Sequence, residues 1–345
     1  MVSGLRSQVS GLRSQVSGLR DIYIDSLRGL AVILVVLGHA LGWFKELESA
    51  SIITGWIYSF HVPLLFMISG YVQEMSRKNL SLQDYITKNF IDLYIPCIFF
   101  SYLQFACNKF VFSSFNPAGF RVPDYSELFT ILFLGFKNYW FLCTLFFVKV
   151  LDKILDFDEK INYICWLIIC IVIIIFRWSL PEFITQFYYG LYFCAGKFFK
   201  RLGLMTRAKL FYGVIFIIIG MLFFFVPVFY VKGSDLGRLS PLRTYAAIFM
   251  SVGLFIAFHA LKIDNKFLVT CGVYSMVVYT IHNFIAAPLR VICRLSGLNE
   301  PLLMLIFCFI MAVLVPLLVV KIYKRVKFLR WVEYIFYPGK LFYKK

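Results

Sequence analysis

The stretch RGLAVILVVLGH, residues 28–39, begins with an arginine and ends with a histidine, with ten uncharged, mostly aliphatic residues between them. Such a run predicts a membrane-spanning helix. An α-helix turns 100° and rises about 1.5 Å per residue, so Arg28 and His39 share nearly one face, roughly 16 Å apart along the axis. Arg28 would then lie near one interface and His39 near the middle of the membrane. Polar groups at that depth are costly unless they face a protein interior or a watery cavity, so both are candidate functional residues.

The whole chain has the composition of a membrane protein. Of its 345 residues, 61% are hydrophobic and 15% are charged, and the mean hydropathy is +0.81. We therefore expect an all-α integral membrane bundle of about ten transmembrane helices. Apolar windows of about 19 residues place these helices near residues 24–44, 51–75, 90–111, 138–155, 161–180, 183–200, 208–231, 243–262, 267–289 and 300–322.

The distribution of positive charge predicts the topology. An even number of helices puts both termini on one side, and about 25 of the 35 lysines and arginines fall in the termini and in the alternate loops on that side. By the positive-inside rule that side is the cytoplasm. The net charge of +17 then reflects topology and attraction to anionic membrane lipids, and a nucleic-acid partner is not expected. We expect a multi-pass protein of the inner, or plasma, membrane.

Two tails flank the predicted transmembrane domain, residues 21–325. Residues 1–20 repeat VSGLRSQ, which is too short and too rich in glycine and serine for a coiled coil and predicts a disordered basic tail. Residues 326–345 are basic and aromatic, and we expect a cytoplasmic tail along the inner leaflet. Between the second and third helices, SRKNLSLQDYITKNF (76–90) favours an amphipathic interfacial helix with its lysines near lipid headgroups.

All four histidines fall in hydrophobic segments. His39 and His61 lie midway along the first two predicted helices, so we expect them to meet near the midplane, whereas His282 lies along the ninth. For His259, close to a helix end, a hydrogen bond to a neighbouring helix is the expected role.

Asp25 precedes Arg28 by three residues, and the two form an interfacial ion pair or belong to the same site. From the residues alone, Arg28 and His39 suit equally an enzyme that binds an anionic cofactor and a proton-coupled transporter.

Four stretches resemble the acyltransferase 3 family of membrane proteins. RGLAVILVVLGH has the family signature of an arginine, ten residues and a histidine on the first helix. Similar to later family segments are SFHVPLLFMISGYV (59–72), NYWFLCTLFF (138–147) and CGVYSMVVYTIHNFI (271–285). One departure is that family members often carry two arginines just before the third-helix proline, where KNFIDLYIP (88–96) has only Lys88.

The resemblance implies an O-acyltransferase that moves an acyl group, commonly acetyl from acetyl-CoA, onto a hydroxyl of a cell-surface or lipid-linked glycan. Histidine can act as general base on such a hydroxyl, and arginine can bind donor phosphates. The expected catalytic residues are His39 and His61. The residues expected to bind the donor are Arg28, Asp25, Lys78 and Lys88. Those expected to contact the acceptor are Trp140, Tyr71 and His282. No metal is expected, and the alternative is a proton-coupled transporter or exporter that uses the same histidines and arginine.

Overall fold

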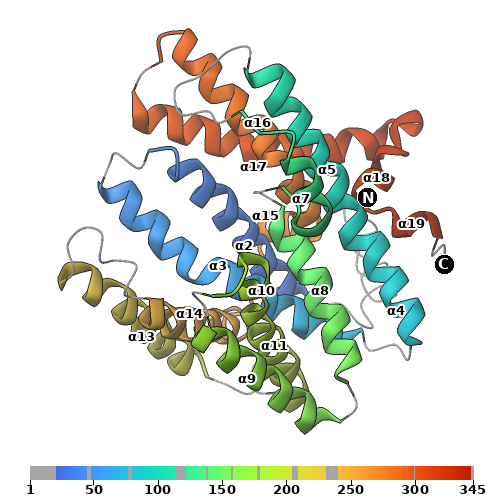
Figure 1. The fold of residues 1–345 in the computed structure, drawn as a ribbon. Coiled ribbons are helices and arrows are strands. Elements are labelled where there is room, and N and C mark those ends of the chain that lie inside the picture. The colour runs from blue at the N-terminus through green and yellow to red at the C-terminus, as the bar shows by residue number, and fades with distance from the viewer. Residues whose placement is uncertain are drawn as a thin grey trace, which may run out of the picture.

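The computed structural model describes residues 21–44, 48–76, 80–113, 122–136, 139–156, 158–176, 179–203, 209–230, 240–298 and 300–342. Every regular element in these ranges is helical (Figure 1). Seven helical segments within them are long and apolar enough to cross a membrane. They are α2 (Ile22–Leu41), α3 (Glu48–Met75), the segment Leu82–Val111, α13 (Leu210–Tyr230), α14 (Ser240–Ala260), α16 (Ser275–Leu295) and α17 (Pro301–Arg325). The described residues form the all-α bundle of a multi-pass membrane protein.

The other three predicted segments form shorter helices. These are α8 (Trp140–Ile154), α9 (Glu159–Phe176) and α11 (Gly190–Leu202), the last preceded by α10 (Glu182–Thr185) and η3 (Gln186–Tyr189). α8 has 15 residues and α11 has 13, fewer than the about 20 that span a hydrocarbon core. α11 packs along α3 and α9 inside the bundle. The total of ten membrane segments stays a prediction.

α2 lies centrally in the bundle, in contact with α3, α14, α16, α17 and α15 (Lys266–Val273). Glycines let α2 and α15 touch backbone to backbone. A Cβ on Gly29 would lie 1.9 Å from Leu268 O, and a Cβ on Gly272 would lie 1.8 Å from Asp25 O. Small residues at helix crossings allow this approach in membrane proteins. The crossing fixes the turn of α2 that carries Arg28 against α15.

The predicted helix at 267–289 is interrupted. α15 ends at Val273, Tyr274 has φ −104° and ψ 24°, and α16 begins at Ser275. The interruption places the first turn of α16 beside α2, where it contributes to the site described below.

Within the predicted interfacial helix at 76–90, residues 82–90 are the first part of one long helical segment. α4 (Leu82–Asn89) continues through the π-helical turn η1 (Phe90–Tyr94) into α5 (Ile95–Ala106) and η2 (Cys107–Phe112). In η1, Ile95 N–H donates to Phe90 O, five residues back. Pro96 follows at once and has no N–H to donate, so the wider π turn lets the helix pass it without a break.

The C-terminal tail does more than follow the membrane surface. Its described part contains η5 (Lys327–Leu329), α18 (Val332–Phe336) and α19 (Gly339–Phe342). Phe336 is 4% exposed and stacks on Phe100, with ring centroids 5.3 Å apart. The Tyr337 hydroxyl donates to Val273 O at 3.4 Å. Phe328 and Trp331 are exposed, so one side of the tail packs on the bundle and the other is open. The predicted N-terminal tail, 1–20, lies outside the described residues.

Candidate active site

Arg28 lies in the second turn of α2, at the end of the bundle that we call the Arg28 end. The helix begins because Asp21 Oδ1 accepts hydrogen bonds from the N–H groups of Tyr23 at 3.1 Å and Ile24 at 3.3 Å. Arg28 Nη1 lies 3.7 Å from Asp25 Oδ1, and the Arg28 side chain is 26% exposed. The expected ion pair therefore forms, while the guanidinium stays within reach of a ligand.

A cavity of about 140 Å³ opens beside Arg28. Its walls come from α2, α3, η1, α8 and the first turns of α16, and most of them are apolar. Arg28 is the charged residue in the lining, and Ser69, Ser275 and Tyr279 add hydroxyl groups. Ser275 reaches the cavity because the helix is interrupted at Tyr274. The cavity can therefore hold an apolar chain with an anionic group at the Arg28 end.

Three histidines lie beyond the cavity. The Tyr279 ring is 6.2 Å from the His282 ring, which is 5.3 Å from the His39 ring. The Tyr58 ring contacts both His39, at 6.2 Å, and His61, at 5.2 Å between ring centroids. A continuous row of rings therefore connects the cavity to all three histidines. His39 and His61 come together as expected, through the tyrosine that both contact.

Hydrogen bonding fixes the proton on two of these imidazoles. His61 Nδ1 lies 2.7 Å from Ile57 O, and His282 Nδ1 lies 2.7 Å from Tyr279 O. A carbonyl oxygen can only accept, so Nδ1 donates in both rings and each neutral ring keeps a lone pair on Nε2. Within the described residues, His282 Nε2 has no hydrogen-bond partner and His39 forms no side-chain hydrogen bond. Imidazoles in this state can accept a proton from a hydroxyl.

Tyr71, expected to contact the acceptor, contacts Asp21, at the start of α2, and the fourth histidine, His259. Its hydroxyl donates to Asp21 Oδ2 at 3.5 Å, and His259 Nε2 is 2.9 Å from the same oxygen. Burial acts to raise the pKa of the Asp21 carboxyl, but the hydrogen bond and charge of His259, with two backbone N–H groups, lower it overall. His259 therefore ties α14 to the start of α2, which agrees with the inter-helix hydrogen bond expected of it.

The remaining predicted residues are dispersed. Trp140 begins α8 and packs on Tyr189, with ring centroids 5.6 Å apart. Lys88 Nζ is 2.6 Å from Asp92 Oδ2, so an acidic partner already holds it. Lys78 lies outside the described residues. The structure therefore brings together His39, His61 and His282, with Arg28 and Asp25 at the other end of the cavity.

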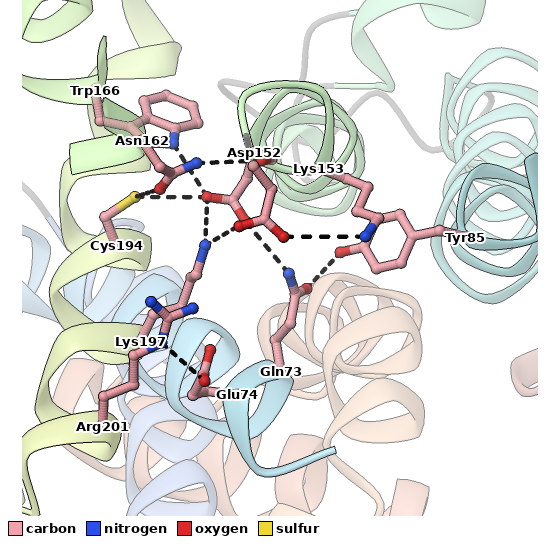
Figure 2. A network of polar contacts seen from close by, with 11 residues as sticks. Gln73, Glu74, Tyr85, Asp152, Lys153, Asn162, Trp166, Cys194, Lys197 and Arg201 are labelled. Atoms are coloured by element: carbon pink, nitrogen blue, oxygen red, sulfur yellow. Dashed lines mark hydrogen bonds and ion pairs between the residues drawn. The ribbon is translucent and has the colours of Figure 1, made fainter. Parts of the chain in front are cut away.

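A second polar cluster, which we call the Asp152 cluster, was missed by the sequence analysis (Figure 2). Lys197 Nζ lies 2.8 Å and 2.9 Å from the two carboxylate oxygens of Asp152. Trp166 Nε1 donates to Oδ1 at 3.2 Å, and Gln73 Nε2 donates to Oδ2 at 3.4 Å. Asp152 is 1% exposed and Lys197 is 4% exposed. The signal in the sequence was the few charges within two apolar segments, 138–155 and 183–200, among them Asp152 and Lys197.

Comparison with known proteins decides the family. Residues 21–321 match the acyltransferase 3 family, described as an acyltransferase domain. The chain belongs to this family. The chain is also 28% identical over 144 residues to the nodulation protein NolL of Sinorhizobium fredii. That match covers 39% of the chain and 36% of NolL, so the chain spans about a third of the length of this relative. No solved structure matches the chain.

The family match covers every residue of the candidate site. Asp25 and Arg28, near its start in the sequence, and His282, near its end, all fall inside residues 21–321. The family domain therefore contains Arg28, the apolar cavity beside it and the row of three histidines.

Proposed function

We propose that this acyltransferase moves an acyl group, acetyl from acetyl-CoA, onto a hydroxyl of a cell-surface or lipid-linked glycan in the inner, or plasma, membrane. The observation that carries the proposal is the path from Arg28 through the cavity to Tyr279, and from there by ring contacts to His282 and His39. A polyanionic donor needs a cation at one end of this path, and a hydroxyl acceptor needs a base at the other.

Arg28 suits the donor. Its planar guanidinium can give two parallel hydrogen bonds to a phosphate, and the neighbouring Asp25 orients it. The separation of ~16 Å between Arg28 and His39 along α2 is one that an extended pantetheine arm can cover. The thioester would then reach the histidines while the phosphates stay at the membrane interface.

His39 suits the acceptor. In the proposed step the acceptor oxygen attacks the thioester carbonyl carbon, the new C–O bond forms and the C–S bond breaks. His39 takes the proton of the attacking hydroxyl and returns it to the departing CoA sulfur. His61, which contacts the same tyrosine, is the second candidate base, and His282 and Trp140 are candidates for acceptor contact.

We further propose ten membrane segments with both termini in the cytoplasm, so that Arg28 faces the cytosolic donor. The charge count supports this topology. Helix ends that carry basic residues also gather at the Arg28 end, as in the pair of Arg201 on α11 with Glu74 on α3, Nε to Oε1 2.8 Å. Reporter fusions test the topology, and a C-terminus outside the cytoplasm would contradict it.

The activity is tested by CoA thiol release from purified protein in detergent. With acetyl-CoA as donor, we expect release that depends on an added glycan acceptor and disappears in His39→Ala. Transport of the same glycan across vesicles with no thiol release, even with acceptor present, would contradict acyl transfer from CoA.

A further inference from the structure

Lys149 continues the face of α8 that lines the cavity. Leu142 and Leu145 form part of the cavity wall. Lys149 follows them by seven and four residues on the same helix, so its side chain leaves α8 from the same face, one turn nearer the Arg28 end. Its ammonium is close enough to Arg28 for the two positive charges to repel each other.

The contacts of Lys149 place it beside residues that line the cavity. Its Nζ donates to Asn89 Oδ1 at 3.3 Å, and Asn89 Nδ2 in turn donates to Tyr85 O at 2.8 Å. Leu93, one turn after Asn89, lines the cavity. Lys149 therefore bridges from α8 to the third membrane segment one turn from Leu93 of the cavity lining, and its hydrogen-bond partner among the described residues is neutral.

The nearby acidic groups are already engaged. Asp92 forms an ion pair with the Lys88 ammonium, 2.6 Å away. Asp152 forms an ion pair with the Lys197 ammonium (Figure 2). Lys149 and Arg28 thus place two positive charges near one another, with the Asp25 carboxylate 3.7 Å from the Arg28 guanidinium. Two like charges in a partly buried place repel, and a bound anion would remove that repulsion.

We propose that Lys149 is a second donor-binding cation, which holds a phosphate of the acyl-CoA beside Arg28. The inference rests on the proposed function, because it assigns a residue to the same donor site. An ammonium with one neutral partner keeps two hydrogens for phosphate oxygens. Lys88, which the sequence suggested for this role, is paired with Asp92. In this proposal Lys149, from another helix, takes the role instead.

The test is acetyl-CoA affinity, measured by calorimetry on the purified full-length protein in detergent. We expect Lys149→Met to weaken binding by about tenfold or more, the scale of one charged hydrogen bond, and Lys149→Arg to stay near wild type. Lys149→Gln, which can still donate to Asn89, should lose as much as Lys149→Met and serves if that variant folds poorly. The matched control is Lys153→Met, one turn along α8, whose ammonium lies 3.9 Å from Asp156 Oδ2.

A second probe, acetyl-pantetheine, lacks the phosphates. Its affinity should be equal in wild type and in Lys149→Met. An equal loss for acetyl-pantetheine, or an equal loss of acetyl-CoA affinity in Lys153→Met, would overturn the inference. Wild-type affinity in Lys149→Met with weakened binding in Arg28→Ala would overturn it while the proposed function stands. Absence of acetyl-CoA binding to the wild type would overturn both.

Discussion

Asp152 of the Asp152 cluster and His282 of the histidine row are equally buried but differ in how their polar atoms are satisfied. Asp152 and His282 are each 1% exposed. Both carboxylate oxygens of Asp152 accept hydrogen bonds, and a lysine neutralises the charge. His282 Nε2 has no partner among the described residues. Buried polar groups are nearly always bonded, so the satisfied cluster holds helices together, and the unsatisfied nitrogen agrees with the substrate contact proposed for His282.

The largest effect is expected on catalysis, from substitution in the histidine row. His39→Ala should lower acyl transfer at least ~10²-fold, because the hydroxyl loses its proton acceptor. Acetyl-CoA affinity and melting temperature in detergent should stay near wild type, because His39 makes no side-chain hydrogen bond within the described residues. Full activity in His39→Ala would show that His39 is not the general base and leave His61 and His282 as candidates.

In the Asp152 cluster, Asp152→Asn should lower the stability of the protein. It leaves the Lys197 ammonium buried without its counter-charge, a change that costs about 3–5 kcal/mol. We expect a large fall in melting temperature and yield, and unchanged acetyl-CoA affinity in the protein that remains folded. The double variant Asp152→Asn, Lys197→Met should recover part of the loss. A stable Asp152→Asn protein with no activity would reverse the comparison.

A smaller effect is expected at the contact between Asp21 and His259. The pKa of the Asp21 carboxyl is lowered from 3.8, so the ionised form stabilises the fold above that value, and this contribution is lost as pH falls through the lowered pKa. Asp21→Asn keeps an N-cap residue but removes the charge. Its melting temperature should lie below that of wild type at pH of about 5, and the gap should narrow at pH of about 3. A gap that does not change with pH would exclude the charge as its cause.

The helix that carries Arg28 and His39 was predictable, because a long apolar run specifies a membrane helix and helical geometry fixes which residues share a face. α2, Ile22–Leu41, confirms the helix. The contact of His39 with His282 was not predictable, because it depends on how α2 and α16 pack, and nothing near either histidine in the sequence records that packing.

Local breaks were also hidden. The break at Tyr274 has no proline or positive-φ glycine to signal it, yet it brings Ser275 to the cavity. The charges of Asp152 and Lys197 were visible in their apolar segments, but their pairing needed the contact of α8 with α11. The sequence therefore predicted the first helix and the family, and the structure showed which residues surround Arg28 and His39.

The central claim is that one helix holds the donor at Arg28 and the base at His39, and the affinity of Arg28→Ala for acetyl-CoA tests it most directly. Loss of a charged, bidentate phosphate contact should weaken binding by ~1.5–3 kcal/mol, and Arg28→Lys should recover only part, because a point charge cannot reproduce the planar fork. His39→Ala, measured beside it, should bind as wild type does. Unchanged acetyl-CoA affinity in a well-folded Arg28→Ala protein would contradict the claim and leave Arg28 as the partner of Asp25 alone in holding the helix end.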